Sequence, residues 1–357
     1  MNYISAKEVA KLWGISQRRV AILCSTDRIP NAKKIGSMWL IPKYAKKPND
    51  GRSARKYMKE KRMRPFIKWA GGKGQLVDEI KKYYPVGIGK TIKKYAEPFV
   101  GGGAVLLDIL NKYELDEVYI SDSNAELINT YQVIRDNVND LIALLSKYQD
   151  EYIPLDDDSR KEYYYKKRKR FNNLKCEGIL DTEISSLFIF LNKTCFNGLY
   201  RVNSNGEYNV PIGSYKAPLI CDADNLHIVS KALSNVTIRC ADYRESSYFI
   251  DSNTFAYFDP PYRPLNATSS FTSYTENVFD DKAQEELAGF IKKLSDKGAF
   301  VVASNSDPKN INPNDEFFDD LYSEMTIIRI PASRMINSKG SSRGKINELL
   351  IHNGSVK

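Results

Sequence analysis

Residues 255–262 read FAYFDPPY, an apolar segment that ends in a carboxylate, two prolines and an aromatic ring. The exocyclic amino group of a nucleobase is a poor nucleophile, because its lone pair is delocalised into the ring. The carboxylate of Asp259 and a backbone carbonyl can each accept one N–H bond of such a group and draw its nitrogen towards tetrahedral geometry. Pro260 and Pro261 stiffen the backbone and supply no competing N–H donors. Tyr262 can stack on the base, which must leave the duplex to reach it.

A glycine-rich turn lies upstream of this motif. Gly101, Gly102 and Gly103 separate a predicted strand from a predicted helix in residues 94–113. Glycines at this place let a ligand approach the backbone and the free N–H groups of a helix N-terminus. Asp122 ends the next predicted strand, where an acid can accept hydrogen bonds from ribose hydroxyls. The pattern fits NAD, FAD or S-adenosylmethionine, although the spacing is not GxGxxG, and a turn that only tightens strand–helix packing has the same composition.

These motifs require elements that position them, and strands alternate with helices from residue 65 onward. After the glycine turn, strands are predicted at 117–122, 254–259, 299–307 and 346–353. A helix is predicted at 124–148. This alternation favours an α/β fold with a doubly wound, mainly parallel sheet. Residues 150–235 break the alternation and are rich in Tyr, Asn and charged residues, so we interpret them as an inserted, mainly helical subdomain.

The positive charge is concentrated at the N-terminus. The net charge is +9, and residues 1–64 carry 17 Lys and Arg against 4 Asp and Glu, which leaves 36 and 40 for the rest of the 357 residues. A basic segment attached to a slightly acidic remainder predicts a nucleic-acid partner. A basic, solvated tail is the alternative. Residues 46–64 lack apolar periodicity and are interpreted as a basic linker.

The pattern of residues 1–45 predicts a small DNA-binding module. Ser5 and Glu8 have the spacing of a capping box, Gly14 breaks the helix that they begin, and a second helix with outward arginines follows. Residues 33–42 read as two short strands that form a wing. The segment resembles the winged helix-turn-helix of excisionase- and MerR-like proteins, some of which bind only protein.

Composition excludes several other classes of function. No run of about 18 apolar residues could span a membrane, and the first residues lack the features of a secretory signal, so we expect a cytoplasmic protein. Five dispersed cysteines without a CxxC pair are typical of reduced thiols. With only His227 and His352 in the chain, we expect neither a histidine-based zinc site nor a histidine triad, and we predict no metal.

From about residue 65 to 353 the chain resembles the Dam-type adenine-N6 DNA methyltransferases. PFIKWAGGKGQL (65–76) is similar to the first cofactor motif, EPFVGGGAV to the glycine motif and DPPY to the catalytic motif, and their order is that of the α arrangement. The resemblance implies a Rossmann-like sheet and S-adenosylmethionine as methyl donor. The cofactor-binding residues that it implies are Trp69, Lys73, Phe99, Gly101, Gly103, Asp122, Asp242 and Asp259. The catalytic residues that it implies are Asp259, Pro260, Pro261 and Tyr262.

The insertion resembles the target-recognition domain of family members that methylate GATC. The similarity lies in NKTCFNGLYRVNSNGEYNVPIGSYKAP, residues 192–218. The base-contacting or intercalating residues that it implies are Asn197, Leu199, Arg201, Pro211 and Tyr215. Arg201 can donate to O6 and N7 of a guanine in the major groove, and Leu199 and Tyr215 can wedge or stack between bases. A Gly- and Asn-rich hairpin without a partner has the same composition.

We therefore predict a site-specific adenine-N6 methyltransferase that acts on double-stranded DNA at a bacterial or phage nucleoid, with GATC as the expected target. A cognate restriction endonuclease is a compatible partner. Three alternatives remain. A helix-turn-helix transcription regulator with an inactive or accessory methyltransferase domain explains the N-terminus. A nicotinamide-dependent oxidoreductase shares the glycine turn but gives DPPY no role. A methyltransferase for cytosine N4 or protein glutamine shares the amino-group chemistry, although Asp before PPY favours adenine.

Overall fold

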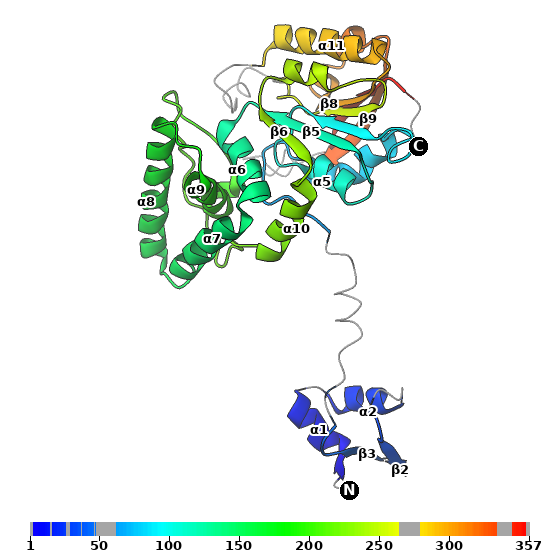
Figure 1. The fold of residues 1–357 in the computed structure, drawn as a ribbon, viewed down its shortest axis with the longest axis vertical. Helices are drawn as coiled ribbons and strands as arrows, with labels where there is room; N and C mark the ends of the chain where they lie inside the picture. The colour runs from blue at the N-terminus through cyan, green and yellow to red at the C-terminus, as the bar shows by residue number, and fades with distance from the viewer. Residues whose placement is uncertain are drawn as a thin grey trace. The chain divides into compact units, whose positions relative to one another are not determined.

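A computed structural model describes residues 3–14, 16–25, 29–36, 38–45, 47, 62–263, 279–333 and 345–354. The chain divides into two compact units, Met1–Arg62 and Met63–Lys357, which are shown with their elements in Figure 1.

The N-terminal unit combines two helices with a three-stranded sheet of order β1-β3-β2. Its elements are β1 (Tyr3–Ser5), α1 (Ala6–Trp13), α2 (Gln17–Ser25), β2 (Lys33–Ile35) and β3 (Met38–Pro42). The predicted capping box is present, because the backbone N–H of Glu8 donates to Ser5 Oγ and the backbone N–H of Ser5 donates to Glu8 Oε2. Gly14 ends α1 in the left-handed conformation at φ 63°, which glycine adopts at little cost.

The larger unit is built on a seven-stranded sheet of order β6-β5-β4-β7-β8-β10-β9. The strands are β4 (Lys94–Glu97), β5 (Glu117–Asp122), β6 (Val236–Cys240), β7 (Thr254–Phe258), β8 (Phe300–Ser306), β9 (Thr326–Ser333) and β10 (Lys345–His352). Neighbouring strands from β6 to β8 pair in parallel, and β10 is antiparallel to both β8 and β9. The predicted α/β fold with a mainly parallel sheet is confirmed.

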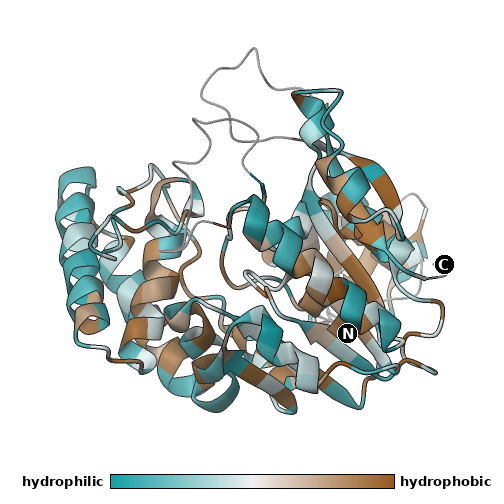
Figure 2. Cartoon of the chain, turned by 90° about the horizontal axis from the view of Figure 1, so that it is seen from above, coloured by the Kyte–Doolittle hydropathy of each residue, from teal (hydrophilic) through white to brown (hydrophobic). Residues whose placement is uncertain are grey.

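The side chains of the central strand β7 alternate between two hydrophobic cores. Phe255 and Tyr257 belong to the core that includes α5 and α6, whereas Ala256 and Phe258 belong to the core that includes α11. A strand that is covered on both faces reads as a continuous apolar run, which explains the sequence FAYF. Figure 2 shows the hydrophobic colouring that follows the strands of the sheet.

The helices of the larger unit cover the sheet and form the insertion. They are α4 (Val77–Ile80), α5 (Ala104–Leu110), α6 (Ala125–Asp136), α7 (Val138–Tyr152), α8 (Asp157–Cys176), α9 (Thr182–Thr194), α10 (Ala223–Leu233), α11 (Asp281–Asp296) and α12 (Phe317–Leu321). The helix predicted at 124–148 is two helices, because Asn137 leaves the helical conformation at φ −134°. α7 and α8 pack on α9, whereas α10 packs on α6.

Candidate active site

The DPPY motif begins where β7 ends, in the middle of the sheet. The Asp259 carboxylate is held by Lys73 and Ser304 rather than pointing into solvent. Lys73 Nζ donates to Asp259 Oδ2 at 2.7 Å and lies 2.5 Å from Oδ1, and Ser304 Oγ donates to Oδ1 at 2.8 Å. Because the Lys73 side chain is only 4% exposed, this is a nearly buried ion pair at the tip of a parallel strand.

The ring of Tyr262 lies next to the same ion pair. Lys73 Nζ is 4.7 Å from the centre of this ring, within the range of a cation–π contact. The Tyr262 hydroxyl donates to Glu348 Oε2 on β10 at 2.7 Å, and burial raises the pKa of this tyrosine. Pro260 is buried, and the carbonyl of Pro261 accepts from Gln284. Asp259, Pro261 and Tyr262 are therefore contacted by side chains from the segment before α4 and from β8, α11 and β10.

The glycine turn is packed too closely for any larger residue. Gly101 and Gly103 have φ of 46° and 67°, the left-handed region that favours glycine. A Cβ on Gly101 would lie 2.7 Å from Trp69 Cδ1, and a Cβ on Gly103 would lie 2.4 Å from the hydroxyl oxygen of Tyr131. The structure thus brings the predicted residues Trp69, Gly101 and Gly103 together around one turn.

The predicted ribose-binding acid lies beside this turn. Asp122 accepts hydrogen bonds from the backbone N–H of Gly101 at 3.1 Å and of Asn124 at 3.0 Å. Burial raises the pKa of Asp122, and these two backbone donors oppose the increase. Each carboxylate oxygen retains a lone pair for a further donor such as a hydroxyl group.

Asp242 and Phe99 reach the same edge of the sheet by different routes. Asp242 follows β6, whose last residue Cys240 pairs with Asp122 in the neighbouring strand. The Asp242 carboxylate accepts from the backbone N–H of Arg244 at 2.9 Å and pairs with its guanidinium. Phe99 follows β4 and stacks on Tyr243 with the ring centres 5.4 Å apart. Phe99 is therefore held by an aromatic stack and Asp242 by an ion pair.

A buried acid that sequence analysis did not single out lies close to the ion pair. Glu97 ends β4 and is 2% exposed, and its carboxylate accepts a hydrogen bond from Tyr95 at 2.7 Å. Burial raises the pKa of Glu97 to about 8, the Tyr95 bond opposes this, and the nearby charge of Asp259 adds to it. The sequence signal that could have pointed to Glu97 is its position as an acidic residue within the apolar stretch YAEPF. Ser304 on β8 and Glu348 on β10 were also not predicted, because neither strand is the one that DPPY follows and the sequence does not show which strands are neighbours.

This raised pKa predicts that stability falls as the pH rises. The folded protein keeps the Glu97 proton up to about pH 8, whereas the unfolded chain loses it near its ordinary pKa of 4.5. Between these values the folded state binds one more proton, so the free energy of unfolding should decrease by about 1.4 kcal/mol per pH unit from this group. Glu97→Gln should remove that contribution, which urea unfolding from pH 5 to 8 would measure. An identical pH slope in both proteins would contradict the expectation.

Residues 195–215 form a hairpin after α9, which we call the recognition hairpin. Its two arms are joined by the bridges Cys195–Ile212 and Val202–Tyr208 and by a hydrogen bond from Phe196 N to the carbonyl of Pro211. Asn197, Arg201 and Pro211 are exposed, whereas Leu199 and Tyr215 are half-buried. Hence the hairpin carries all five predicted recognition residues. Phe196, which is 52% exposed, is an aromatic side chain on this surface that sequence analysis missed.

Two of these predicted recognition residues are held by neighbours. Arg201 Nε donates to Asn209 Oδ1 at 2.8 Å, and no described residue pairs with the two terminal nitrogens of its guanidinium. The Tyr215 hydroxyl accepts from Lys68 Nζ at 3.2 Å, and that ammonium lies 4.6 Å from the centre of the ring. Lys68 directly precedes Trp69, so the hairpin is connected to the predicted cofactor motif.

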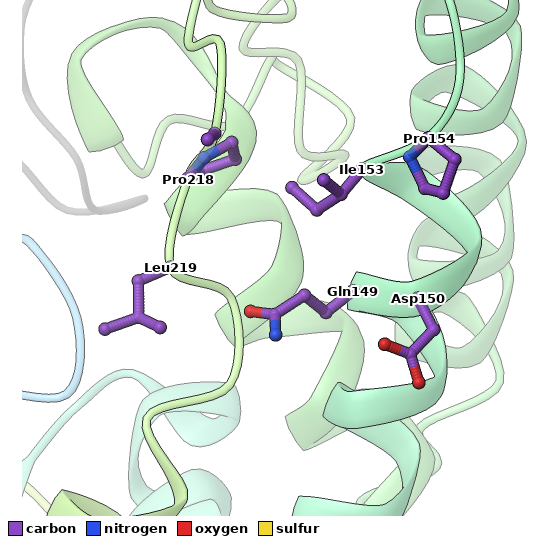
Figure 3. A pocket seen from close by; sticks show the side chains of 7 residues that line it. Gln149, Asp150, Ile153, Pro154, Pro218 and Leu219 are labelled. Atoms are coloured by element: carbon purple, nitrogen blue, oxygen red, sulfur yellow. The ribbon is translucent and has the colours of Figure 1, made fainter. Parts of the chain in front are cut away.

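The described residues also form an open pocket of about 400 Å³, and Figure 3 shows the side chains that line it. It lies between the C-terminal end of α7 and the segment that follows the recognition hairpin, and it contains none of the predicted site residues. The residues that line it are Gln149, Asp150, Ile153, Pro154, Ala217, Pro218 and Leu219. Gln149 fixes one wall, because its Oε1 accepts from the backbone N–H groups of Ile220 and Cys221.

The described ranges contain neither a membrane-spanning helix nor a cluster of metal-binding side chains. Of the helices found there, none is long and apolar enough to cross a membrane. Nor do these ranges contain a group of three or more His, Cys, Asp or Glu residues that could hold a metal ion.

Comparison with known proteins identifies relatives of the larger unit. The family model described as D12 class N6 adenine-specific DNA methyltransferase matches residues 69–336, a range that contains every predicted site residue. The type II methyltransferase M.MjaIII of Methanocaldococcus jannaschii is 50% identical over 295 residues, which cover 82% of this chain and 99% of that protein. M1.LlaDCHI of Lactococcus lactis subsp. cremoris is 36% identical over 82% of this chain and 95% of its own length. A DNA adenine methylase of Haemophilus influenzae is 34% identical with the same coverage.

Proposed function

We propose a specific reaction for this chain, which belongs to the D12 class of N6 adenine-specific DNA methyltransferases. It methylates adenine within GATC after flipping the base out of the duplex. The observation that carries the proposal is the Asp259 carboxylate at the tip of β7 with the ring of Tyr262 near the same ammonium. A base inside a duplex cannot reach such a strand tip, so extrusion is part of the proposal.

The family implies S-adenosylmethionine as the methyl donor, and the residues around the glycine turn fit it. When bound, this compound supplies a methyl group on a sulfonium and becomes a neutral thioether. The bare backbone of Gly101 lets the Trp69 side chain pack directly on the turn, which a larger residue at this position would prevent. Asp122, with its remaining lone pairs, would accept from ribose hydroxyls. Trp69, Gly101 and Asp122 are thus the residues proposed to hold the donor.

The contacts of Asp259 suggest which of its oxygens receives the substrate. Oδ1 is approached by both Lys73 and Ser304, whereas only Lys73 donates to Oδ2 among the described residues. Oδ2 therefore has a lone pair for one N–H of adenine N6. The carbonyl of Pro260, which accepts from no described residue, would take the other. As N6 gains the methyl group it must lose a proton, and Oδ2 is the proposed acceptor.

Tyr262 and the buried surroundings would then orient the base and exclude water. Its ring offers a face for stacking on adenine, and the hydrogen bond to Glu348 restrains the hydroxyl end of that ring. Transfer converts a charged sulfonium into a neutral thioether, so an environment with little water favours it. Lys73 would balance the charge of Asp259 in these surroundings.

The proposed GATC target depends on the recognition hairpin, and Arg201 provides its test. Arg201→Ala should lower the preference for GATC over a duplex changed at the contacted guanine by about 10- to 100-fold, because a bidentate contact contributes about 1–3 kcal/mol of discrimination. Methylation rates on duplexes with GATC and with each single-base change would measure this. Arg170→Ala, at an exposed arginine of α8 paired with Glu183, is the matched control. Equal wild-type rates on all duplexes would refute the GATC target.

We further propose that residues 1–45 form a helix-turn-helix DNA-binding module that a basic linker, residues 46–64, joins to the methyltransferase domain. A truncated protein that begins at Arg62 should lose about tenfold in affinity for a long duplex at low salt, because cationic contacts to phosphates are removed. Its affinity should also depend less steeply on salt concentration. Fluorescence anisotropy over a salt series would measure both. Unchanged affinity and salt slope would contradict this role.

A cognate restriction endonuclease is proposed as a functional partner, since two of the relatives are named type II methyltransferases. Host DNA would then survive only when it is methylated. Loss of this chain in its own host should therefore cause cleavage of genomic DNA at the unmethylated target. Intact, unmethylated DNA in such cells would argue for a methyltransferase that acts without an endonuclease.

A further inference from the structure

Tyr200 lies on the recognition hairpin between two of the predicted recognition residues. The backbone at Leu199 is extended, with φ −79° and ψ 148°, so neighbouring side chains point to different sides. Arg201 is exposed, whereas the Tyr200 side chain is only 5% exposed. Tyr200 therefore points into the protein from the same short stretch that presents Arg201 outward.

The buried ring of Tyr200 rests on the tryptophan of the proposed cofactor site. The rings of Trp69 and Tyr200 are stacked, with centres 5.8 Å apart and an angle of 23° between their planes. Trp69 also packs on the glycine turn. A Cβ added to Gly101 or Gly102 would lie within 3 Å of the Trp69 side chain. Trp69 is thus shared by the turn proposed to hold the donor and by the hairpin proposed to read DNA.

The hydroxyl of Tyr200 is fixed by two charged side chains. It donates to Glu126 Oε2 at 3.2 Å and accepts from Lys175 Nζ at 3.2 Å, and Lys175 also donates to Glu126 Oε1 at 2.6 Å. Glu126 belongs to the first turn of α6, which follows the loop after Asp122. The hydroxyl therefore connects the hairpin to a second part of the proposed cofactor site.

Asn192 provides a further connection between the same two regions. Its side chain accepts from the backbone N–H of Lys68 at 2.8 Å and donates to the carbonyls of Lys68 at 2.8 Å and of Gly198 at 2.9 Å. Asn192 is 3% exposed, so these bonds are shielded from water. Lys68, the residue before Trp69, is consequently fixed to Gly198 near the start of the hairpin. Gly198 lies two residues before Tyr200.

We propose that Tyr200 is a positioning residue for sequence recognition, which couples S-adenosylmethionine binding at Trp69 to the placement of Leu199 and Arg201. A donor that packs against Trp69 fixes the surface on which Tyr200 stacks, and this favours one arrangement of the hairpin. Each ligand should then strengthen the binding of the other by the same factor. This inference rests on the proposed function, and it adds the residue that links its two binding sites.

The test is a thermodynamic cycle on the full chain. The dissociation constant of a target duplex is measured with and without S-adenosylhomocysteine, and that of S-adenosylhomocysteine with and without the duplex. The wild-type protein should show a ratio of about tenfold in both directions. Tyr200→Leu should reduce the ratio to about 1, whereas Tyr200→Phe, which keeps the stack, should retain most of it. Tyr148→Leu, at a tyrosine of α7 that is 5% exposed and packs on Phe190, should leave the ratio unchanged.

The outcomes separate failure of the coupling from failure of the proposed function. The duplex is one that the wild-type protein methylates, identified by sequencing modified bases, so a target other than GATC affects only the proposed function. A wild-type ratio of 1, or a tenfold ratio retained in Tyr200→Leu, would overturn the role of Tyr200. An equal loss in Tyr148→Leu would also overturn it, because loosening of the insertion would then explain the effect. If Tyr200→Leu does not fold, Tyr200→Met takes its place, since it fills a similar volume without an aromatic ring and should also reduce the ratio to about 1, whereas Tyr200→Phe should preserve it.

Discussion

Replacing Asp259 by alanine should lower the rate of methyl transfer by about 10³-fold while the protein still binds its target duplex. The change removes the oxygen proposed to accept the N–H and then the proton of adenine N6. The residues of the recognition hairpin that are proposed to contact DNA bases remain in place. Single-turnover transfer of a labelled methyl group, together with fluorescence anisotropy on the same duplex, would measure the two effects separately.

Stability must be checked in the same experiment, because Asp259 is also the partner of a nearly buried ammonium. Without it, Lys73 retains the carbonyl of Gly71 as an acceptor but has no counter-charge, which can cost about 3–5 kcal/mol. Asp259→Asn keeps the shape of the side chain and should fold better while remaining almost inactive. Asp251→Ala is the matched control, since Asp251 pairs with Lys94 near the opposite end of β7 and its loss should change the rate less than twofold. Normal transfer by either Asp259 variant would refute the assigned role.

Gly101→Ala should raise the concentration of S-adenosylmethionine needed for half-maximal rate by about 10- to 100-fold. The added Cβ would lie 2.7 Å from Trp69 Cδ1 and 2.9 Å from Trp69 Nε1, and Gly101 has a φ of 46°. Strain of this kind costs about 1–3 kcal/mol, and relief requires the Trp69 ring to move from the turn. Since that ring is proposed to contact the donor, the loss should fall on donor affinity more than on DNA affinity.

A second glycine supplies the control for this experiment. Gly289 lies in α11, and a Cβ placed on it meets no heavy atom within 4 Å. Gly289→Ala should leave the kinetic constants unchanged and raise stability by up to about 1 kcal/mol, because alanine favours a helix. Isothermal titration with S-adenosylhomocysteine would compare donor affinity in the two variants. A Gly101→Ala protein with wild-type donor affinity would show that this turn does not hold the donor.

Motifs whose parts are adjacent in the chain were predictable from the sequence. FAYFDPPY required only local reasoning, because a continuous apolar run signals a strand covered on both faces and its polar ending signals a site. The turn at the three glycines and the acid Asp122 at a strand end could also be predicted, since positive φ and a strand end are local properties. The expected α/β fold followed from the alternation of such segments and is confirmed. By contrast, the break at Asn137 was missed, because a polar residue within a helical pattern does not reveal its own backbone conformation.

What the tertiary structure decided is which distant side chains surround those motifs. Lys73 and Asp259 are 186 residues apart, yet they form the central ion pair, because the order of the strands brings the segment before α4 to the tip of β7. Glu348 restrains Tyr262 only because β10 lies in the same sheet, and Tyr200 reaches Trp69 only because the insertion folds back. A sequence pattern reports periodicity and local conformation. Contacts between strands and across an insertion depend on topology and packing, which no single segment contains.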